Sequence, residues 1–187
     1  MFGREEQALV LDFLPYGKSA EARKEPVVQL LGDAQFTLLE ATPKLGVVLS
    51  PGETVYVGKD ERPKIDRIKG RITWRELTNA AQHECRTQLL RIVKEREPRF
   101  VEFLNRAGAI NIRSHSLEHL PAVGKKHLTV LLEQREKKPF ESFADVHARV
   151  PHLGRIEDLI AQRIEHELGG DAKYYLFSKP IKKEDGY

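Results

Sequence analysis

Short apolar runs separated by turn residues occupy the first 73 residues of the chain. Gly32-Asp33 stands between two such runs, and Ser50-Pro51-Gly52-Glu53 stands between two others. Gly-X and Pro-Gly pairs are typical of tight turns, because Gly adopts a positive φ and Pro fixes its own. The runs predict five or six strands, over residues 8–14, 27–31, 35–41, 45–49, 54–57 and 65–72. Short strands without intervening helices favour a small OB-like β-barrel.

The apolar period changes to that of a helix near Thr73. Thr73-Trp74-Arg75-Glu76 has the spacing of a capping box, and apolar residues then recur every three or four positions up to Val93. Glu97-Pro98 predicts a break or a kink, followed by a short helix over residues 99–107. The sequence therefore predicts an α+β protein with three segments: a barrel (1–73), bridging helices (74–112) and a C-terminal domain (113–187).

A repeated hexapeptide marks the C-terminal segment. Leu120-Pro121-Ala122-Val123-Gly124-Lys125 recurs thirty positions later as Val150-Pro151-His152-Leu153-Gly154-Arg155. Each copy follows a short helical stretch, 116–120 or 143–149, and precedes a longer helical pattern. We expect Pro to end the first helix, the apolar residue before Gly to enter the core, and Gly to let a phosphate approach the backbone. The free amides and dipole of the next helix then favour an anion.

These residues resemble the helix-hairpin-helix family in a tandem arrangement over residues 114–168. The usual first glycine of that family is Ala122 in one copy and His152 in the other. The whole chain also resembles an archaeal family, domain of unknown function 655, described as predicted RNA-binding proteins. That resemblance implies an N-terminal barrel, a C-terminal hairpin module and an RNA role, and it implies no activity.

The two hairpins differ in charge after their glycines. Lys125, Lys126 and His127 follow Gly124, whereas Arg155, Glu157 and Asp158 follow Gly154. Acidic residues in the first turn complement the helix dipole and repel a phosphate. We therefore expect Gly154 and Arg155 to be mainly structural. The predicted nucleic-acid-binding residues are Ala122, Val123, Gly124, Lys125 and Lys126, with added charge from Arg113, Lys137 and Lys138.

Charge, hydropathy and cysteine content indicate where in the cell the protein is expected. The net charge is +3, from 31 Lys and Arg against 28 Asp and Glu, and the basic excess is biased toward the C-terminal half, including Lys179, Lys182 and Lys183. No apolar run reaches the ~20 residues of a membrane helix, and the N-terminus lacks a secretory signal. Cys85 is the only cysteine. These features predict a soluble cytoplasmic protein without disulfides or membrane attachment.

Several other residues resemble metal-binding, thiol or base-stacking sites, but the sequence around them favours structural roles. His115-Ser116-Leu117-Glu118-His119 matches the H-x-x-E-H zinc-protease pattern, but Pro121 leaves only about one helical turn there. Cys85 falls on an apolar helix face, which indicates a buried, inert thiol. Phe36 and Tyr56 either fill the barrel or stack on bases. Residues 174–177 form an aromatic run that either adds a strand or packs on helices, and residues 179–187 read as a mobile tail. We expect no catalytic residue, metal or cofactor.

The sequence thus predicts a non-catalytic nucleic-acid-binding protein that contacts the phosphate backbone through the first hairpin. RNA is favoured over DNA because of the family resemblance and the barrel. DNA binding through the same hairpin is the first alternative. A protein-interaction scaffold with purely structural hairpins is the second, and an enzyme is the third.

Overall fold

The computed structural model describes residues 4–22 and 24–181 of the chain, which divides into two compact units. One unit comprises residues 1–88 with 166–187, and the other comprises residues 89–165. Helices α1 (Asn79–Glu95) and α5 (Ile156–Leu168) have residues in both units. The three segments expected from the sequence (1–73, 74–112 and 113–187) do not coincide with these two units. That division of the chain stays a prediction. Within the described residues, no helix is both long and apolar enough to cross a membrane.

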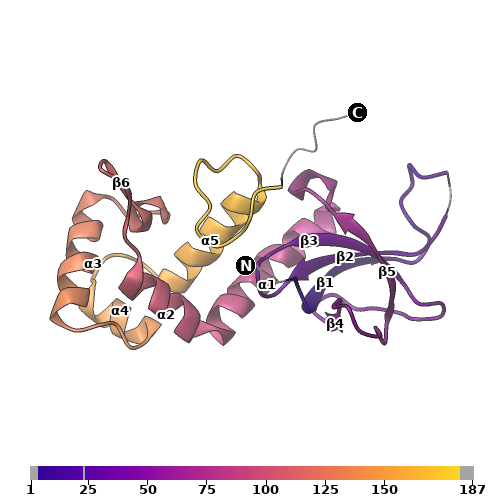
Figure 1. The fold of residues 1–187 in the computed structure, drawn as a ribbon, viewed down its shortest axis with the longest axis horizontal. Helices are drawn as coiled ribbons and strands as arrows, with labels where there is room; N and C mark the ends of the chain where they lie inside the picture. Colours follow the sequence, from indigo (N-terminus) through magenta and orange to yellow (C-terminus); the bar gives the residue numbers. More distant parts are fainter. Residues whose placement is uncertain (1–3, 23, 182–187) are drawn as a thin grey trace. The chain divides into compact units, whose positions relative to one another are not determined.

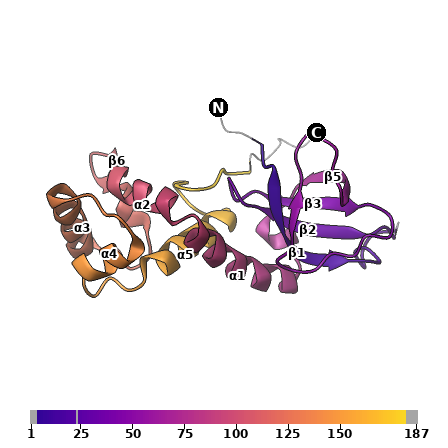
Figure 2. The same cartoon turned by 90° about the horizontal axis from the view of Figure 1, so that it is seen from below.

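The first unit is built on a curled antiparallel sheet of five strands in the order β4-β1-β2-β3-β5 (Figures 1 and 2). The strands are β1 (Gln7–Leu14), β2 (Val27–Gly32), β3 (Leu38–Pro43), β4 (Thr54–Tyr56) and β5 (Ile65–Arg71). Among the described residues, no ladder of hydrogen bonds joins the edge strands β4 and β5. The protein is therefore α+β, as predicted, with a half-barrel in this unit.

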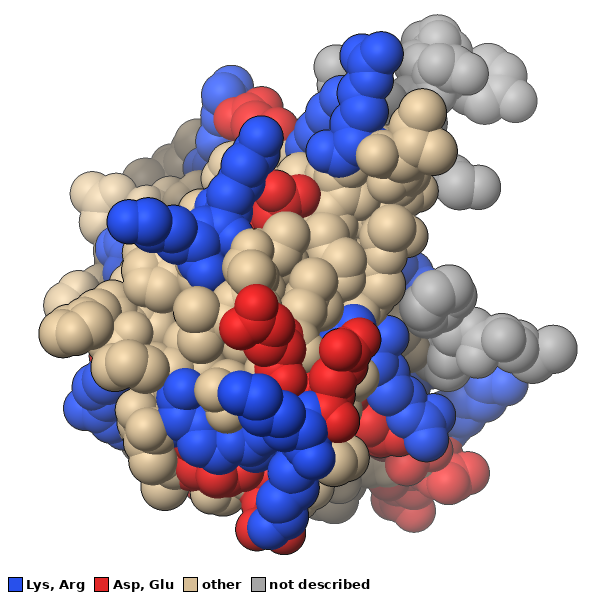
Figure 3. Space-filling model, turned by 90° about the vertical axis from the view of Figure 1, so that its left-hand side faces the viewer, with Lys and Arg blue, Asp and Glu red and all other residues tan. Residues whose placement is uncertain are grey.

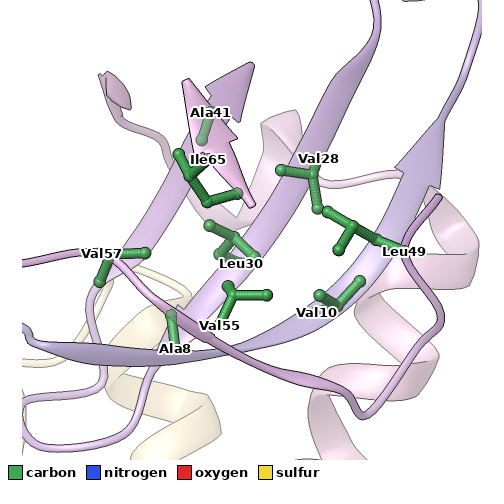
Figure 4. Packing of buried hydrophobic residues seen from close by; sticks show 9 residues of the cluster. All are labelled: Ala8, Val10, Val28, Leu30, Ala41, Leu49, Val55, Val57 and Ile65. Atoms are coloured by element: carbon green, nitrogen blue, oxygen red, sulfur yellow. The ribbon is translucent and has the colours of Figure 1, made fainter. Parts of the chain in front are cut away.

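Alternating apolar residues of the strands fill the concave side of the sheet. Val10 of β1, Leu30 of β2 and Val55 of β4 belong to one buried cluster, and Figure 4 shows their side chains directed toward one another. A shift in register between Val10 and Asp12 marks a bulge in β1. Bulges bend a strand and increase its twist, which is consistent with the curl of the sheet.

One strand prediction and one turn prediction in this unit are wrong. Residues 45–49 form no strand, because the chain turns at Lys44–Val47 with Gly46 at φ +77° and leaves Leu45 fully exposed. Gly32-Asp33 is no two-residue turn either: β3 begins only at Leu38, after a loop over residues 33–37. The turn at Ser50–Glu53 is confirmed, with Gly52 at φ +83°.

The capping box at Thr73 is confirmed, although it begins a short 3-10 helix rather than α1. The amide of Thr73 donates to Glu76 Oε2 at 2.7 Å, at the start of η1 (Trp74–Glu76). Helix α1 starts after Thr78, whose hydroxyl accepts the amide of Ala81 at 3.0 Å. The break near Pro98 is also confirmed. Helix α2 (Glu97–Arg106) carries this proline in its first turn, where its missing N–H is not needed.

The second unit contains a small hairpin that the sequence analysis missed. Strands β6 (Ala109–Asn111) and β7 (Ser114–His115) pair after α2 and lead into η2 (Ser116–His119). Helices α3 (Lys125–Lys137), α4 (Phe143–Arg149) and the first ten residues of α5 follow. The core of this unit includes Phe100, Leu117 and Leu131, each buried.

Residues 174–177 form no strand. The buried carboxylate of Glu167 accepts the amides of Leu176, Phe177 and Ser178 at 2.7–3.1 Å, and it also accepts the Ser178 hydroxyl. A carboxylate bound by several amides fixes a loop firmly. Residues 182–187 of the predicted tail lie outside the described residues, as do Lys182 and Lys183.

Candidate nucleic-acid interface

The first hairpin joins η2 to α3 in a tight turn. Ala122 has φ +60°, in the left-handed region where glycine is usual, and Gly124 has an extended conformation with φ −86° and ψ −174°. Val123 between them is 5% exposed, and its amide donates to the carbonyl of Leu120. Val123 therefore fills the core as predicted, while its neighbours Ala122 and Gly124 face solvent.

The N-terminus of α3 is open and basic. Gly124 is the N-cap and provides no side chain to accept the first amides of the helix. No acidic residue lies in the first turn, and Lys125 and Lys126 are exposed. An added Cβ at Gly124 would meet no atom within 4 Å. Because the first amides of a helix have no partner within it, this turn presents donors and positive charge to an incoming anion.

The second hairpin has a similar turn but an occupied helix start. His152 has φ +65°, like Ala122, and Gly154 has φ +86°, unlike Gly124. The imidazole Nε2 of His147 lies 3.2 Å from the amide nitrogen of Ile156 and 3.0 Å from a carboxylate oxygen of Glu157. It can therefore accept the amide when neutral and donate to the carboxylate when protonated.

Glu157 supplies the negative charge at the start of α5. Arg155 donates to its carboxylate at 2.9 Å, and Asp158 lies in the same turn. Burial alone would raise the pKa of Glu157, but hydrogen bonds from its own amide and from Arg155, with the nearby charge of His147, lower it. The residues of this turn thus place negative charge at the start of α5.

The structure separates the other predicted basic residues from the start of α3. Lys137 and Lys138 lie at the far end of the helix, about 18 Å from Lys126 at ~1.5 Å per residue. Lys138 pairs there with Glu141 at 2.9 Å. Figure 3 shows the side of the molecule that carries α3, where Lys and Arg gather in separate groups rather than in one patch.

Arg113 belongs instead to the tip of the β6–β7 hairpin, beside the fully exposed Ile112. Both β7 and α3 contact η2, and Ser116 of η2 donates its hydroxyl to the carbonyl of Gly108 at 2.8 Å. These contacts connect the hairpin tip to the turn at Gly124 through one short helix. The sequence signal for this hairpin was the alternation of Ile110 and Ile112 with polar residues.

The H-x-x-E-H motif caps η2. His115 Nδ1 accepts the amide of Leu117 at 3.1 Å, and Glu118 accepts the amide of His115 at 2.8 Å. His119 Nε2 lies 2.8 Å from the hydroxyl of Ser114. Burial and the charge of Arg135 lower the pKa of His115, which keeps Nδ1 available as an acceptor, while Glu118 opposes this. In the described part of the chain, no three His, Cys, Asp or Glu residues are grouped to hold a metal ion.

The aromatic residues proposed for base stacking do not form a platform. Phe36 is fully buried, so it fills the interior of its unit. The hydroxyl of Tyr56 donates to Asp60 at 3.2 Å, and its ring packs over Gly58. Cys85 is buried, as expected from its place on the apolar face of α1.

Comparison with known proteins places the chain in a family. Residues 4–179 match the model of the protein family of unknown function DUF655. An uncharacterised protein of Methanocaldococcus jannaschii is 44% identical over 94% of this chain and 80% of its own length. A crystal structure of a DUF655 protein from Archaeoglobus fulgidus is 40% identical, with a TM-score of 0.87 over 94% of this chain and 100% of that chain. The chain therefore belongs to the DUF655 family.

Proposed function

We propose that this protein is a non-catalytic, cytoplasmic nucleic-acid-binding protein that holds a phosphate of an RNA backbone at the start of α3. The observation that carries the proposal is the open helix N-terminus between Gly124 and Lys126. It combines a first helical turn without a capping side chain, two exposed lysines and a glycine with free space around it.

The geometry favours a phosphate over a base. Backbone amides in a helix first turn point along the helix axis and carry about half a positive charge together. Such donors bind any phosphate oxygen and do not distinguish base edges. The exposed side chains of Lys125 and Lys126 add charge at the same point. Binding should therefore be independent of sequence and weaken steeply as salt rises.

The turn conformation supports a helix-hairpin-helix interpretation. Ala122 and His152 occupy equivalent positions of the repeat and share the left-handed conformation. Val123 and Leu153, next along the chain, are both buried. The backbone therefore repeats at these positions of the hexapeptide, although it differs at the glycines, and this repetition supports a tandem hairpin module.

The test is a titration of labelled duplex RNA, duplex DNA and single-stranded RNA at two salt concentrations. The Gly124→Glu, Lys125→Glu variant places carboxylates at the helix start without a steric clash at residue 124. We expect its affinity for the preferred ligand to fall by about 100-fold at low salt, because phosphate contacts are lost and repulsion is added. The ranking of the three ligands decides between RNA and DNA.

Lys94→Glu is the matched control, since Lys94 is exposed on α1 and belongs to the same compact unit. This substitution reverses one charge at a position that is distant from the hairpin in the sequence. Affinity equal to that of the wild type is expected. Weak, salt-insensitive binding by all three proteins would overturn the proposal and favour a scaffold that binds another protein.

A further inference from the structure

The half-barrel of the first unit contains a groove beside its unpaired edge strands. Strands β4 and β5 lie at opposite ends of the strand order. A cavity of about 660 Å³ is lined by Val57 and Arg62, which follow β4, and by Arg67, Ile68 and Arg71 of β5. The groove thus lies between segments that a closed barrel would bring into contact.

The groove has an apolar floor. Leu39 and Ile68 are partly buried and pack against the core cluster that contains Val57. Leu39 and Ile68, which are only partly buried, offer an apolar surface to the flat face of a base or to a sugar. None of the described residues that line the groove is aromatic, so stacking does not select particular bases.

The rim of the groove is strongly basic. Its cationic lining residues are Arg4, Arg62, Arg67, Arg71 and Lys179. Glu5 is the one acidic residue among the described residues of the lining. Its carboxylate accepts the amides of Ala34, Gln35 and Thr37 at 2.9–3.1 Å and is 8% exposed, so it is already engaged on the protein side.

Two of the arginines are held in place by the backbone. Arg62 Nε donates to the carbonyl of Gly58 at 2.9 Å, and Arg71 Nη2 donates to the carbonyl of Lys179 at 3.1 Å. Each of these bonds uses one of the five N–H donors of a guanidinium. The remaining donors can form the paired hydrogen bonds that arginine makes with phosphate. Arg67 pairs with Glu25 at 2.7 Å, yet its side chain is 59% exposed.

We propose that this groove is a second nucleic-acid site, which binds a single strand by its phosphates. The cations lie on segments that flank both sides of the apolar floor, and their number exceeds what one phosphate needs. An extended strand matches this arrangement, because it presents successive phosphates beside unpaired bases. The site belongs to a different compact unit from the hairpin at Gly124 and does not depend on the function proposed for that hairpin.

The experiment measures binding of a labelled oligouridylate of about ten nucleotides, a length typical of such sites. The groove variant is Arg4→Glu, Arg67→Glu, which leaves the backbone bonds of Arg62 and Arg71 intact. The control is Lys44→Glu, Lys94→Glu, which changes the net charge equally outside the groove. We expect the groove variant to bind at least about 10-fold more weakly at low salt, with the log–log salt slope reduced by about 0.7 per lost phosphate contact.

Parallel measurements separate this proposal from the function proposed above. Gly124→Glu, Lys125→Glu should retain groove binding of oligouridylate, seen as shifts of the amide signals of Gly70 and Arg71 in nuclear magnetic resonance spectra. If that variant loses all binding while the groove variant binds like the wild type, the groove proposal is wrong and the hairpin proposal stands. If inorganic triphosphate binds as tightly as oligouridylate, the groove holds small phosphates and no strand.

Discussion

The two hairpins of the second unit have similar turns and opposite electrostatics. In both, the residue after proline is left-handed and the following apolar residue is buried. After Gly124 the next helix starts with lysines and no capping side chain, whereas after Gly154 it starts with Glu157 bound to Arg155 and close to His147. The comparison shows that similar turns can precede helix starts of opposite charge, and the proposed function assigns a ligand only to the basic one.

The largest effect on stability should come from removing the internal anion of the second hairpin. Glu157→Ala removes the carboxylate that pairs with both Arg155 and His147 and should lower the free energy of unfolding by about 1–3 kcal/mol, although Asp158 stays near Arg155. A change in the first turn of α3, Lys126→Ala, should be within about 0.5 kcal/mol of the wild type, as for other exposed positions. Urea denaturation of the three proteins measures both values, and equal losses would contradict the comparison.

The two glycines should respond differently to the same substitution. Gly154 has φ +86°, so Gly154→Ala should cost about 1–2 kcal/mol of unfolding free energy. Gly124 has φ −86° with open space around it, so Gly124→Ala should cost less than about 0.5 kcal/mol. Thermal unfolding of both variants measures the difference. A greater loss at Gly124 would show that the conformations assigned to the two turns are wrong.

Introducing glycine at the left-handed position of the first hairpin should stabilise the protein. Ala122 has φ +60°, and Ala122→Gly relieves that backbone cost, offset partly by the greater freedom of glycine in the unfolded chain. We expect a gain of about 0.5–1 kcal/mol in unfolding free energy with phosphate affinity unchanged. Denaturant titration together with the binding assay tests this prediction. A destabilised variant would show that Ala122 carries no backbone strain in the folded protein.

The smallest effects should appear in the pH dependence of stability. The pKa of His115 is lowered on folding, so the unfolded chain takes up the proton more readily and stability falls as the pH drops below about 6.5. The pKa of Glu157 is also lowered, so its contribution is present above 4.5 and is lost as the pH falls through the folded value.

His115→Gln should therefore flatten the stability profile just below pH 6.5, and Glu157→Gln should flatten it below pH 4.5. Unfolding followed across pH 3–8 separates the two ranges. His83→Gln, at an exposed position of α1, is the control for the first. An unchanged profile in His115→Gln would contradict the role of this imidazole as an acceptor.

Local chemistry explains which parts of the fold the sequence predicts. The turn at Ser50–Glu53 and the capping box at Thr73 depend on residues within four positions of each other, and both are found. Residues 45–49 are misassigned because an apolar run resembles a strand even where Gly46 turns the chain. The open edge between β4 and β5 depends on pairing between distant segments, which no short pattern encodes.

The same distinction applies to the candidate sites. The hairpin at Gly124 is visible in six consecutive residues, and the contrast with Gly154 follows from charges in the adjacent turn. The groove unites Arg4 with Arg62 and Arg71, which are far apart in the chain, and the apparent bias of basic residues toward the C-terminal half concealed it. Three-dimensional structure is needed to bring such residues together.

The most direct test of the hairpin comparison is amide chemical-shift mapping of the labelled protein during titration with duplex RNA and duplex DNA at low and high salt. The account predicts salt-sensitive shifts at the amides of Lys125, Lys126 and His127, with the amides of residues 156–158 unmoved. Shifts at the start of α5 equal to those at the start of α3, or none at either helix, would contradict it.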